Sequence, residues 1–273
     1  MRRWIASSVF CVTFALSALP ADAQYAVRRN SDRATGENYH VEVSGYFWNP
    51  TPDIVIASES LPGIIGDRID FVNDLGLEKT RFTQLRVVLR PGTKHKFRFE
   101  YTPIKFDQPD GTLTRDVVFN GLTYRIGLPV ATTVDWNAYR FSYEYDIVYR
   151  DRGFFGIVLE AKYTDVRAEL VNLINTEFVH ARAPIPAVGA IGRVYVTPNI
   201  SITGEFSGFR LPESIDEDYK AKYYDFDLYG TVNFNDYVGA QLGFRSFDVF
   251  YRIDNDEGDL QLRGLYFGGV VRF

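Results

Sequence analysis

Cysteine is almost missing from this sequence of 273 residues, since the only one is Cys11. It lies in an apolar stretch from Trp4 to Leu19 and lacks the small residues that precede a lipoprotein cleavage site. The stretch follows two arginines and ends before Ala21-Asp22-Ala23, which is the layout of a secretory signal peptide. We therefore expect residues 1–23 to be removed, leaving a chain without disulfides or a cysteine nucleophile.

Long apolar runs are also scarce. No later stretch approaches the roughly 20 residues that a membrane-spanning helix needs, so none is expected in the mature chain. Of 30 basic and 35 acidic residues, the signal peptide removes Arg2, Arg3 and Asp22, which leaves 28 and 34 and a net charge of −6. This balance excludes the basic footprint of a nucleic-acid-binding protein, so no nucleic acid is expected as a partner.

Aromatic residues and glycine are abundant, with 18 Tyr, 22 Phe and 22 Gly. Over residues 138–150 every odd-numbered position from Tyr139 to Tyr149 is aromatic or aliphatic, while the even-numbered ones include Arg140 and Glu144. Alternation with period two predicts β-strands with one apolar and one polar face. Similar segments are 39–48, 81–90, 95–103, 122–130, 155–164, 190–197, 200–208, 223–234, 238–245 and 260–273.

The lengths of these segments favour a transmembrane antiparallel β-barrel over a soluble β-sandwich. The apolar runs last about 9 to 11 residues, which is what a tilted strand needs to cross a bilayer. Short turns at 91–93, 120–121, 151–153, 198–199 and 235–236 alternate with longer links at 49–80, 168–188, 211–222 and 252–259. This alternation is typical of short periplasmic turns and longer extracellular loops.

The last residues, Leu265 to Phe273, resemble the assembly signal of the Gram-negative outer-membrane β-barrel superfamily, with a terminal Phe preceded by apolar residues at every second position. The segment from Gly66 to Leu77 also resembles one found in uncharacterised outer-membrane proteins. The resemblance implies an all-β barrel in the bacterial outer membrane, inserted by the barrel-assembly machinery with Phe273 as the signal. Outer-membrane lipid and lipopolysaccharide are then the expected surroundings.

An even number of strands is expected, and we predict about 12, with 10 as the alternative. Twelve strands require residues 112–119 and 122–130 to form a transmembrane hairpin around Asn120-Gly121, a favoured hairpin dipeptide. If that pair instead extends an external loop, the count is 10. The predicted organisation is a signal peptide (1–23), a flexible periplasmic lead-in (24–37) and the barrel (38–273).

The polar faces of the strands would point into the lumen and carry seven basic and eight acidic side chains. We predict that a narrow, porin-like channel passes small polar solutes passively between these groups. The alternative is a non-conducting structural or surface-interaction barrel in which they pair and plug the lumen. The predicted lumen-lining residues are Glu42, Arg86, Arg90, Arg98, Glu100, Arg140, Glu144, Asp146, Glu160, Lys162, Arg193, Glu205, Asp225, Asp227 and Arg245.

Enzymatic activity is the competing class, because outer-membrane lipid hydrolases and proteases resemble this chain in size. Only three histidines are available as general bases. His40 and His95 are predicted at periplasmic strand ends, and His180 lies in an external link within one helical turn of Glu177. No nucleophile elbow, metal-ligand spacing or phosphate-binding glycine loop is present, so we expect no catalytic, cofactor or metal site.

The longer links are the expected contact surfaces. Link 49–80 combines the apolar residues 54–56 and 61–65 with an acidic segment from Asp67 to Glu78, and it is expected to fold over the mouth or into the lumen. The acidic residues 212–219 are either solvated or bridged by divalent cations to lipopolysaccharide.

Overall fold

The computed structural model describes residues 33–57, 59–61, 64–65, 67–119, 122–127, 129–171, 176–211, 219–253 and 256–273. The predicted signal peptide, most of the predicted lead-in and the acidic residues 212–218 lie outside these ranges. None of the described residues belongs to a helix long and apolar enough to span a membrane.

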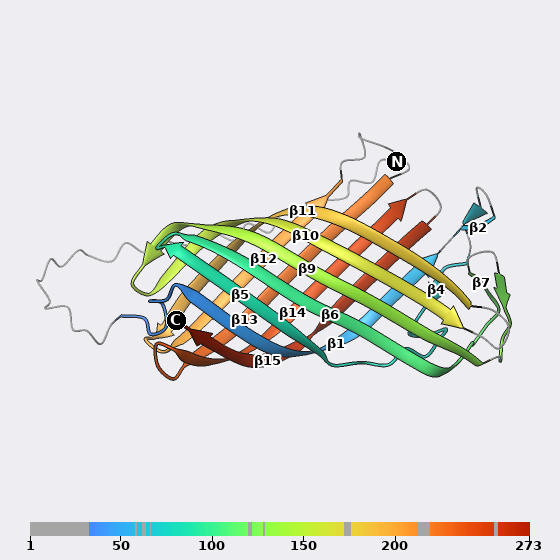
Figure 1. The fold of residues 1–273 in the computed structure, drawn as a ribbon, viewed down its shortest axis with the longest axis horizontal. Helices are drawn as coiled ribbons and strands as arrows, with labels where there is room; N and C mark the ends of the chain where they lie inside the picture. The colour runs from blue at the N-terminus through green and yellow to red at the C-terminus, as the bar shows by residue number, and fades with distance from the viewer. Residues whose placement is uncertain are drawn as a thin grey trace, which may run out of the picture. The chain divides into compact units, whose positions relative to one another are not determined.

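Ten strands form a closed antiparallel ring within the described residues (Figure 1). Each pairs with the next ring strand in chain order, and β15 returns to β1 along a register from Glu42↔Arg272 to Ala57↔Glu257. The ring strands are β1 (Val41–Ala57), β5 (Phe82–Gly92), β6 (His95–Thr112), β9 (Pro129–Arg150), β10 (Gly153–Val171), β11 (Thr176–Thr197), β12 (Ile200–Arg210), β13 (Tyr219–Asn233), β14 (Val238–Ile253) and β15 (Asp256–Arg272).

The five remaining strands are short. β4 (Ile69–Asp70) pairs with β1 through Val55↔Asp70 and Ile56↔Ile69. β2 (Glu59–Leu61) pairs with β3 (Ile64–Ile65), and β7 (Val117–Phe119) with β8 (Leu122–Tyr124).

The prediction of 12 strands is therefore wrong, and the alternative of 10 is confirmed. The expected hairpin exists as β7 and β8, but each has three residues, far short of the 9 to 11 that cross a bilayer. Residues 122–130 are divided between β8 and the start of β9 at Pro129.

We call the end of the barrel with the short connections 93–94, 151–152, 198–199 and 234–237 the turn end, and the opposite end, which carries β2, β4 and β7, the loop end (Figure 1). The turn end is the one predicted to be periplasmic. Toward the loop end the strands run further than expected: β9 and β11 have 22 residues each. Most of the predicted link 168–188 is thus strand.

A belt of exposed apolar side chains surrounds the ring. Every ring strand contributes at least one outward residue that is between 43% and 63% exposed: Phe47, Leu85, Phe97, Phe141, Leu159, Val194, Ile202, Leu228, Leu242 and Phe267. Soluble proteins rarely expose contiguous apolar patches beyond a few hundred Å². The belt is therefore the surface that meets lipid.

The apolar face of a strand changes sides along its length. On β9 the inward even-numbered positions carry Arg140 and Glu144 toward the turn end but Trp136 toward the loop end. The outward odd-numbered positions change from Phe141 to the half-exposed Asp135. The surroundings of the outer face change from lipid to water at this boundary, so the wall beyond it has the pattern of a soluble protein. A search for alternation with one constant apolar face therefore underestimates the length of these strands.

Candidate functional site: the barrel interior

The fifteen residues predicted to line the lumen are all buried, none being more than 8% exposed. They lie on inward positions of the ring strands and form what we call the charged layer. They alternate with exposed apolar residues on the same strands, so their side chains all face the inside of the barrel.

Ion pairs link most of this layer into one continuous chain. Arg86 joins Asp227 and Glu100 at 3.1 and 2.9 Å, Glu100 contacts Arg245, and Arg245 reaches Asp225 at 2.8 Å. From Asp225 the chain continues to Lys162 (3.2 Å), which also pairs with Glu160 (2.9 Å). Arg140 then joins Glu160 to Glu205, and Glu205 pairs with Arg98 at 2.6 Å. Arg98 contacts Glu144, and Lys96 joins Glu144 (2.6 Å) to Asp146 (3.0 Å).

Three further residues belong to the charged layer and were not predicted from the sequence. Lys96 completes the ion-pair chain, Arg272 pairs with Glu42 at 2.6 Å, and Glu37 contacts Arg193 at 2.8 Å. Adding Lys96 and Arg272 to the seven predicted basic residues, and Glu37 to the eight acidic ones, gives nine charges of each sign in the charged layer. Two other buried carboxylates, Asp74 and Glu257, lie toward the loop end, where Asp74 pairs with Arg115 and Glu257 with Arg68 and Arg252. The alternation pattern places Lys96 on the face of Arg98, and Arg272 opposite Phe273, so both were within its reach; Glu37 precedes the strands and gave no such signal.

A short segment closes the turn end. We call residues 34–39 the strap. The Thr35 amide donates to the Pro198 carbonyl (2.7 Å), the Gly36 amide to Asp236 Oδ1 (2.8 Å), and the Asn233 side chain to the Thr35 carbonyl (2.7 Å). The strap thus joins the β11–β12 and β13–β14 turns across the mouth of the barrel. It covers the last four residues of the predicted lead-in.

The Glu37 carboxylate points from the strap into the barrel. Arg193 Nη1 and the Tyr195 hydroxyl donate to Oε1 at 2.8 and 2.9 Å, and Arg90 Nη1 lies 3.7 Å from Oε2. Burial raises the pKa of Glu37, but the charges of Arg193 and Lys96 and the two hydrogen bonds outweigh it and hold this pKa below 4.5. With its pKa lowered on folding, Glu37 stabilises the folded chain above pH 4.5, and this contribution is lost as the pH falls through the lowered pKa.

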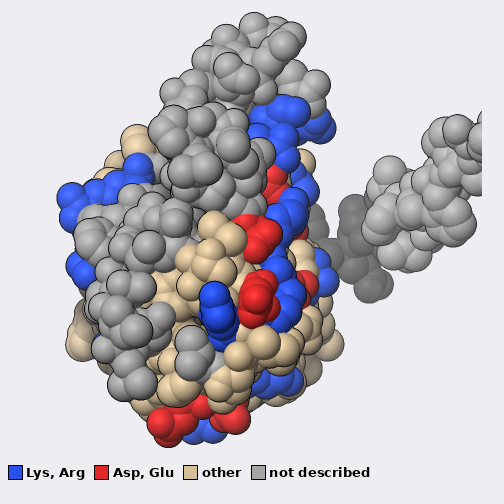
Figure 2. Space-filling model, turned by 90° about the vertical axis from the view of Figure 1, so that its right-hand side faces the viewer, with Lys and Arg blue, Asp and Glu red and all other residues tan. Residues whose placement is uncertain are grey.

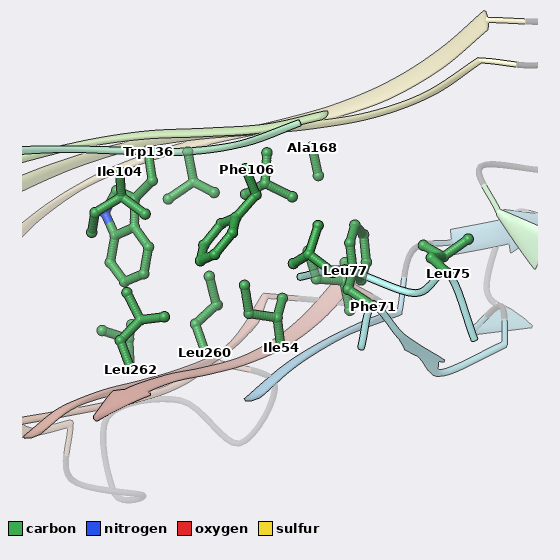
Figure 3. Packing of buried hydrophobic residues seen from close by; sticks show 14 of the residues in the cluster. Ile54, Phe71, Leu75, Leu77, Ile104, Phe106, Trp136, Ala168, Leu260 and Leu262 are labelled. Carbon is green, nitrogen blue, oxygen red and sulfur yellow. The ribbon is translucent and has the colours of Figure 1, made fainter. Parts of the chain in front are cut away.

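The loop-end half of the interior is apolar instead. Large side chains from the ring strands pack against one another there, and Phe71, Leu75 and Leu77 are inserted among them (Figure 3). We call this set the apolar layer: Trp48, Ile54, Phe71, Leu75, Leu77, Phe82, Ile104, Phe106, Val134, Trp136, Phe247, Leu260 and Leu262. The barrel is therefore filled by two layers of different chemistry.

The inserted segment, residues 67–77, acts as an inner lid. The Asp70 carboxylate accepts the Val72 and Asn73 amides at 2.9 Å each, which fixes the turn that presents Phe71. Arg115 Nη2 pairs with Asp74 at 2.9 Å and ties the lid to the segment before β7. Of the two expected positions for this segment, over the mouth or into the lumen, the described residues take the second.

A cavity of about 20 Å³ lies where the two layers meet. Trp48, Trp136 and Phe247 line it from the apolar side and Arg140 and Arg245 from the charged side. Its volume is enough for about one water molecule. The indole nitrogen of Trp136 has no hydrogen-bond partner within the described residues, and in Figure 3 it lies on the side of the ring away from Phe106.

The histidines occupy unrelated places. His40 Nδ1 lies 3.3 Å from the Arg90 carbonyl, and His95 Nδ1 lies 2.7 Å from the Tyr143 hydroxyl on the outer surface. Both are at the turn end, as predicted. His180 belongs to β11, so the helical turn that would have paired it with Glu177 does not form. Within the described residues no three His, Cys, Asp or Glu side chains form a metal-binding group.

The outer wall near the loop end is charged. Arg182 pairs with Asp165 at 3.0 Å, and Arg167 with Glu169 at 3.0 Å. Figure 2 views the molecule from the loop end and shows basic and acidic side chains in a row on the right. This part of the wall is suited to water, not lipid.

Phe273, the predicted assembly signal, is 69% exposed next to β1. Its backbone amide donates to the Val41 carbonyl (2.8 Å), and its carbonyl accepts the His40 amide (2.7 Å). The residue thus extends the closing seam on the lipid-facing side. Its role in assembly stays a prediction.

Comparison with known proteins gives similarity of fold. No protein-family model matches the chain, and no curated protein matches it in sequence. The outer-membrane protease OmpT of Escherichia coli is similar in structure, with a TM-score of 0.56 and 8% identity over 86% of this chain and 97% of that one. The attachment invasion locus protein Ail of Yersinia pestis has a TM-score of 0.35 and 9% identity over 86% and 99%. The toluene transporter TodX of Pseudomonas putida has a TM-score of 0.33 and 8% identity over 86% and 90%.

The likeness to OmpT shows that the chain has the fold of an outer-membrane β-barrel. This agrees with the apolar belt and with the predicted location in the outer membrane. At 8% identity the likeness to OmpT concerns the fold alone, and a barrel of this kind takes its function from the interior and the ends.

Proposed function

We propose that this protein is a non-conducting outer-membrane barrel whose filled interior holds the loop end rigid as an interaction surface. Of the two functions expected from the sequence, this is the second. The observation that carries it is the presence of two packed layers, one charged and one apolar, across the lumen.

The charged layer supports this role by its balance. Nine cations and nine carboxylates leave no net charge to attract a permeant ion, and each ion-pair chain member is held by neighbours on other strands. A channel instead needs binding groups that release the ion again. Pairs at 2.6 to 3.1 Å in a buried setting do not exchange freely with water.

The apolar layer supports it by its close packing. Phe71, Phe106 and Ile54 are fully buried at the loop end, so a polar solute entering there would meet packed hydrocarbon. The lid belongs to this packing through Phe71, Leu75 and Leu77. A rigid inner lid fixes the position of the external segments that surround it, which suits a surface-binding role.

We further propose that the role is non-enzymatic. His40 contacts a backbone carbonyl and His95 a tyrosine hydroxyl on the outer surface. Within the described part of the chain neither histidine forms a hydrogen bond or ion pair with a carboxylate that would orient it as a general base.

Single-channel recording in a planar bilayer tests this function. Folding is first confirmed by heat-modifiable mobility on a gel. We expect insertion of the folded protein to give no unitary conductance at either polarity, because both layers block the lumen.

A steady conductance would contradict the proposal if it belongs to the lumen. Lys162→Gln tests whether a conductance passes through the lumen, because Lys162 lies in the charged layer and faces the cavity between the two layers. A conductance changed by this substitution, and left unchanged by Lys105→Gln on the exposed outer wall, would establish an open lumen.

A further inference from the structure

The turn end holds a cluster of hydrogen-bond donors around one carboxylate. Arg193 and Tyr195 of β11 and Arg90 of β5 surround the Glu37 carboxylate, and each of the three is less than 8% exposed. We propose that these residues form a carboxylate-binding site, and that the strap occupies it with a ligand supplied by the chain itself. The inference goes beyond the proposed function and does not depend on whether the lumen conducts.

The two guanidinium groups of the site have partners in the barrel that do not involve the Glu37 side chain. Arg193 Nε donates to Thr203 Oγ1 at 2.9 Å, and its Nη2 lies 3.4 Å from the Tyr229 hydroxyl. Arg90 Nη2 donates to the Thr93 carbonyl at 3.0 Å. These partners belong to the barrel strands and their turns, so we expect the two guanidinium groups to keep their positions when the Glu37 side chain is removed.

Glu37 fills the site incompletely. Its Oε1 accepts two hydrogen bonds, whereas Oε2 is buried and has no hydrogen-bond partner within the described residues. Arg90 Nη1 is 3.7 Å from this oxygen and donates to the Glu37 backbone carbonyl. A carboxylate freed from the strap is able to move closer to Arg90 and use both oxygens, which a tethered one does not.

Charge determines the class of ligand. Without Glu37 the charged layer holds nine cations and eight carboxylates, so the missing charge is a single negative one. A monovalent carboxylate restores the balance, and its two oxygens suit a guanidinium group. A phosphate carries about −1.5 to −2 at neutral pH and would exceed that charge in a buried site.

Chemical rescue tests the site. In Glu37→Ala the side chain is removed and the site is left empty, so the folded barrel should lose several degrees of thermal stability on a heat-modifiability gel. Sodium acetate should restore most of this loss, while sodium chloride at equal ionic strength restores little. The same acetate concentration should shift the original protein no more than chloride does.

The control is the double variant Glu37→Ala with Arg193→Met, in which acetate should have no advantage over chloride. The proposal would be overturned if both salts stabilised Glu37→Ala equally. It would also be overturned if acetate stabilised the double variant as much as it stabilises Glu37→Ala. If Glu37→Ala fails to fold in chloride, the folded yield on refolding becomes the measurement. A higher yield in acetate then supports the site, and the same low yield in both salts refutes it.

Discussion

Replacing Arg140 with methionine should lower the free energy of unfolding by about 3 to 5 kcal/mol, because it removes a cation that two buried carboxylates share. Arg140 contacts both Glu160 and Glu205, and all three side chains are nearly inaccessible to water. The methionine fills similar space, so the loss reports on charge and not on a cavity. Denaturant titration of the folded barrel in lipid or detergent, followed by gel mobility, measures it.

The matched control is Arg182→Met on the outer wall, where Arg182 pairs with Asp165 in an exposed setting. Exposed pairs are worth about 0 to 1 kcal/mol, so this variant should stay within that range. Adding Glu160→Gln to Arg140→Met should recover part of the loss, since the charged layer then has no excess carboxylate. Similar losses for Arg140→Met and Arg182→Met would show that the charged layer is solvated.

Introducing a charge into the lipid-facing belt should also be costly. Leu228 on β13 is outward and 45% exposed, and its neighbours on the same face are apolar. Leu228→Arg should therefore cost about 2 to 4 kcal/mol if the residue lies near the middle of the bilayer. The same denaturant titration in lipid vesicles measures this loss.

Thr51→Arg is the control for that substitution, because Thr51 is an exposed residue of β1 beyond the apolar belt. It should leave the unfolding midpoint nearly unchanged. If Leu228→Arg folds as well as Thr51→Arg in lipid, the outer face of β13 does not meet the bilayer, and the strand assignment is wrong.

The sequence predicted the parts of the fold that lie within the bilayer. Aromatic and charged residues alternate there with period two, since lipid on one side and paired charges on the other impose opposite demands. All fifteen predicted interior charges follow from this pattern. Lys96 and Arg272 obey it as well, and were missed only because they stand at strand ends.

The strands of the loop-end half were not predicted, for a physical reason. There water replaces lipid outside and the apolar layer replaces the charged one inside, so the pattern inverts on the same strand, as between Arg140 and Trp136 on β9. The inverted segments looked like loops. The insertion of Phe71 depends on contacts with residues far away in the sequence, which no local pattern reveals.

The structure of the strap could likewise not be predicted from its local sequence. Residues 34–39 have no period, and their order comes from hydrogen bonds to turns more than a hundred residues away, such as Thr35 to Pro198. The charge of Glu37 has meaning only once the interior is counted. A sequence pattern shows which side chains share a face of a strand. It does not show which distant segment supplies the charge that neutralises them.

Thiol accessibility of the interior tests the central claim that the lumen is filled. Ser44 is an inward residue of β1, 1% exposed, whose hydroxyl makes no hydrogen bond within the described residues, so Ser44→Cys disturbs little. Its reaction with a charged, water-soluble methanethiosulfonate in the folded barrel should be at least roughly 100-fold slower than that of Thr123→Cys, which is exposed in the β7–β8 hairpin. Comparable rates for the two thiols would mean that water and ions reach the charged layer, and the filled-barrel account would be wrong.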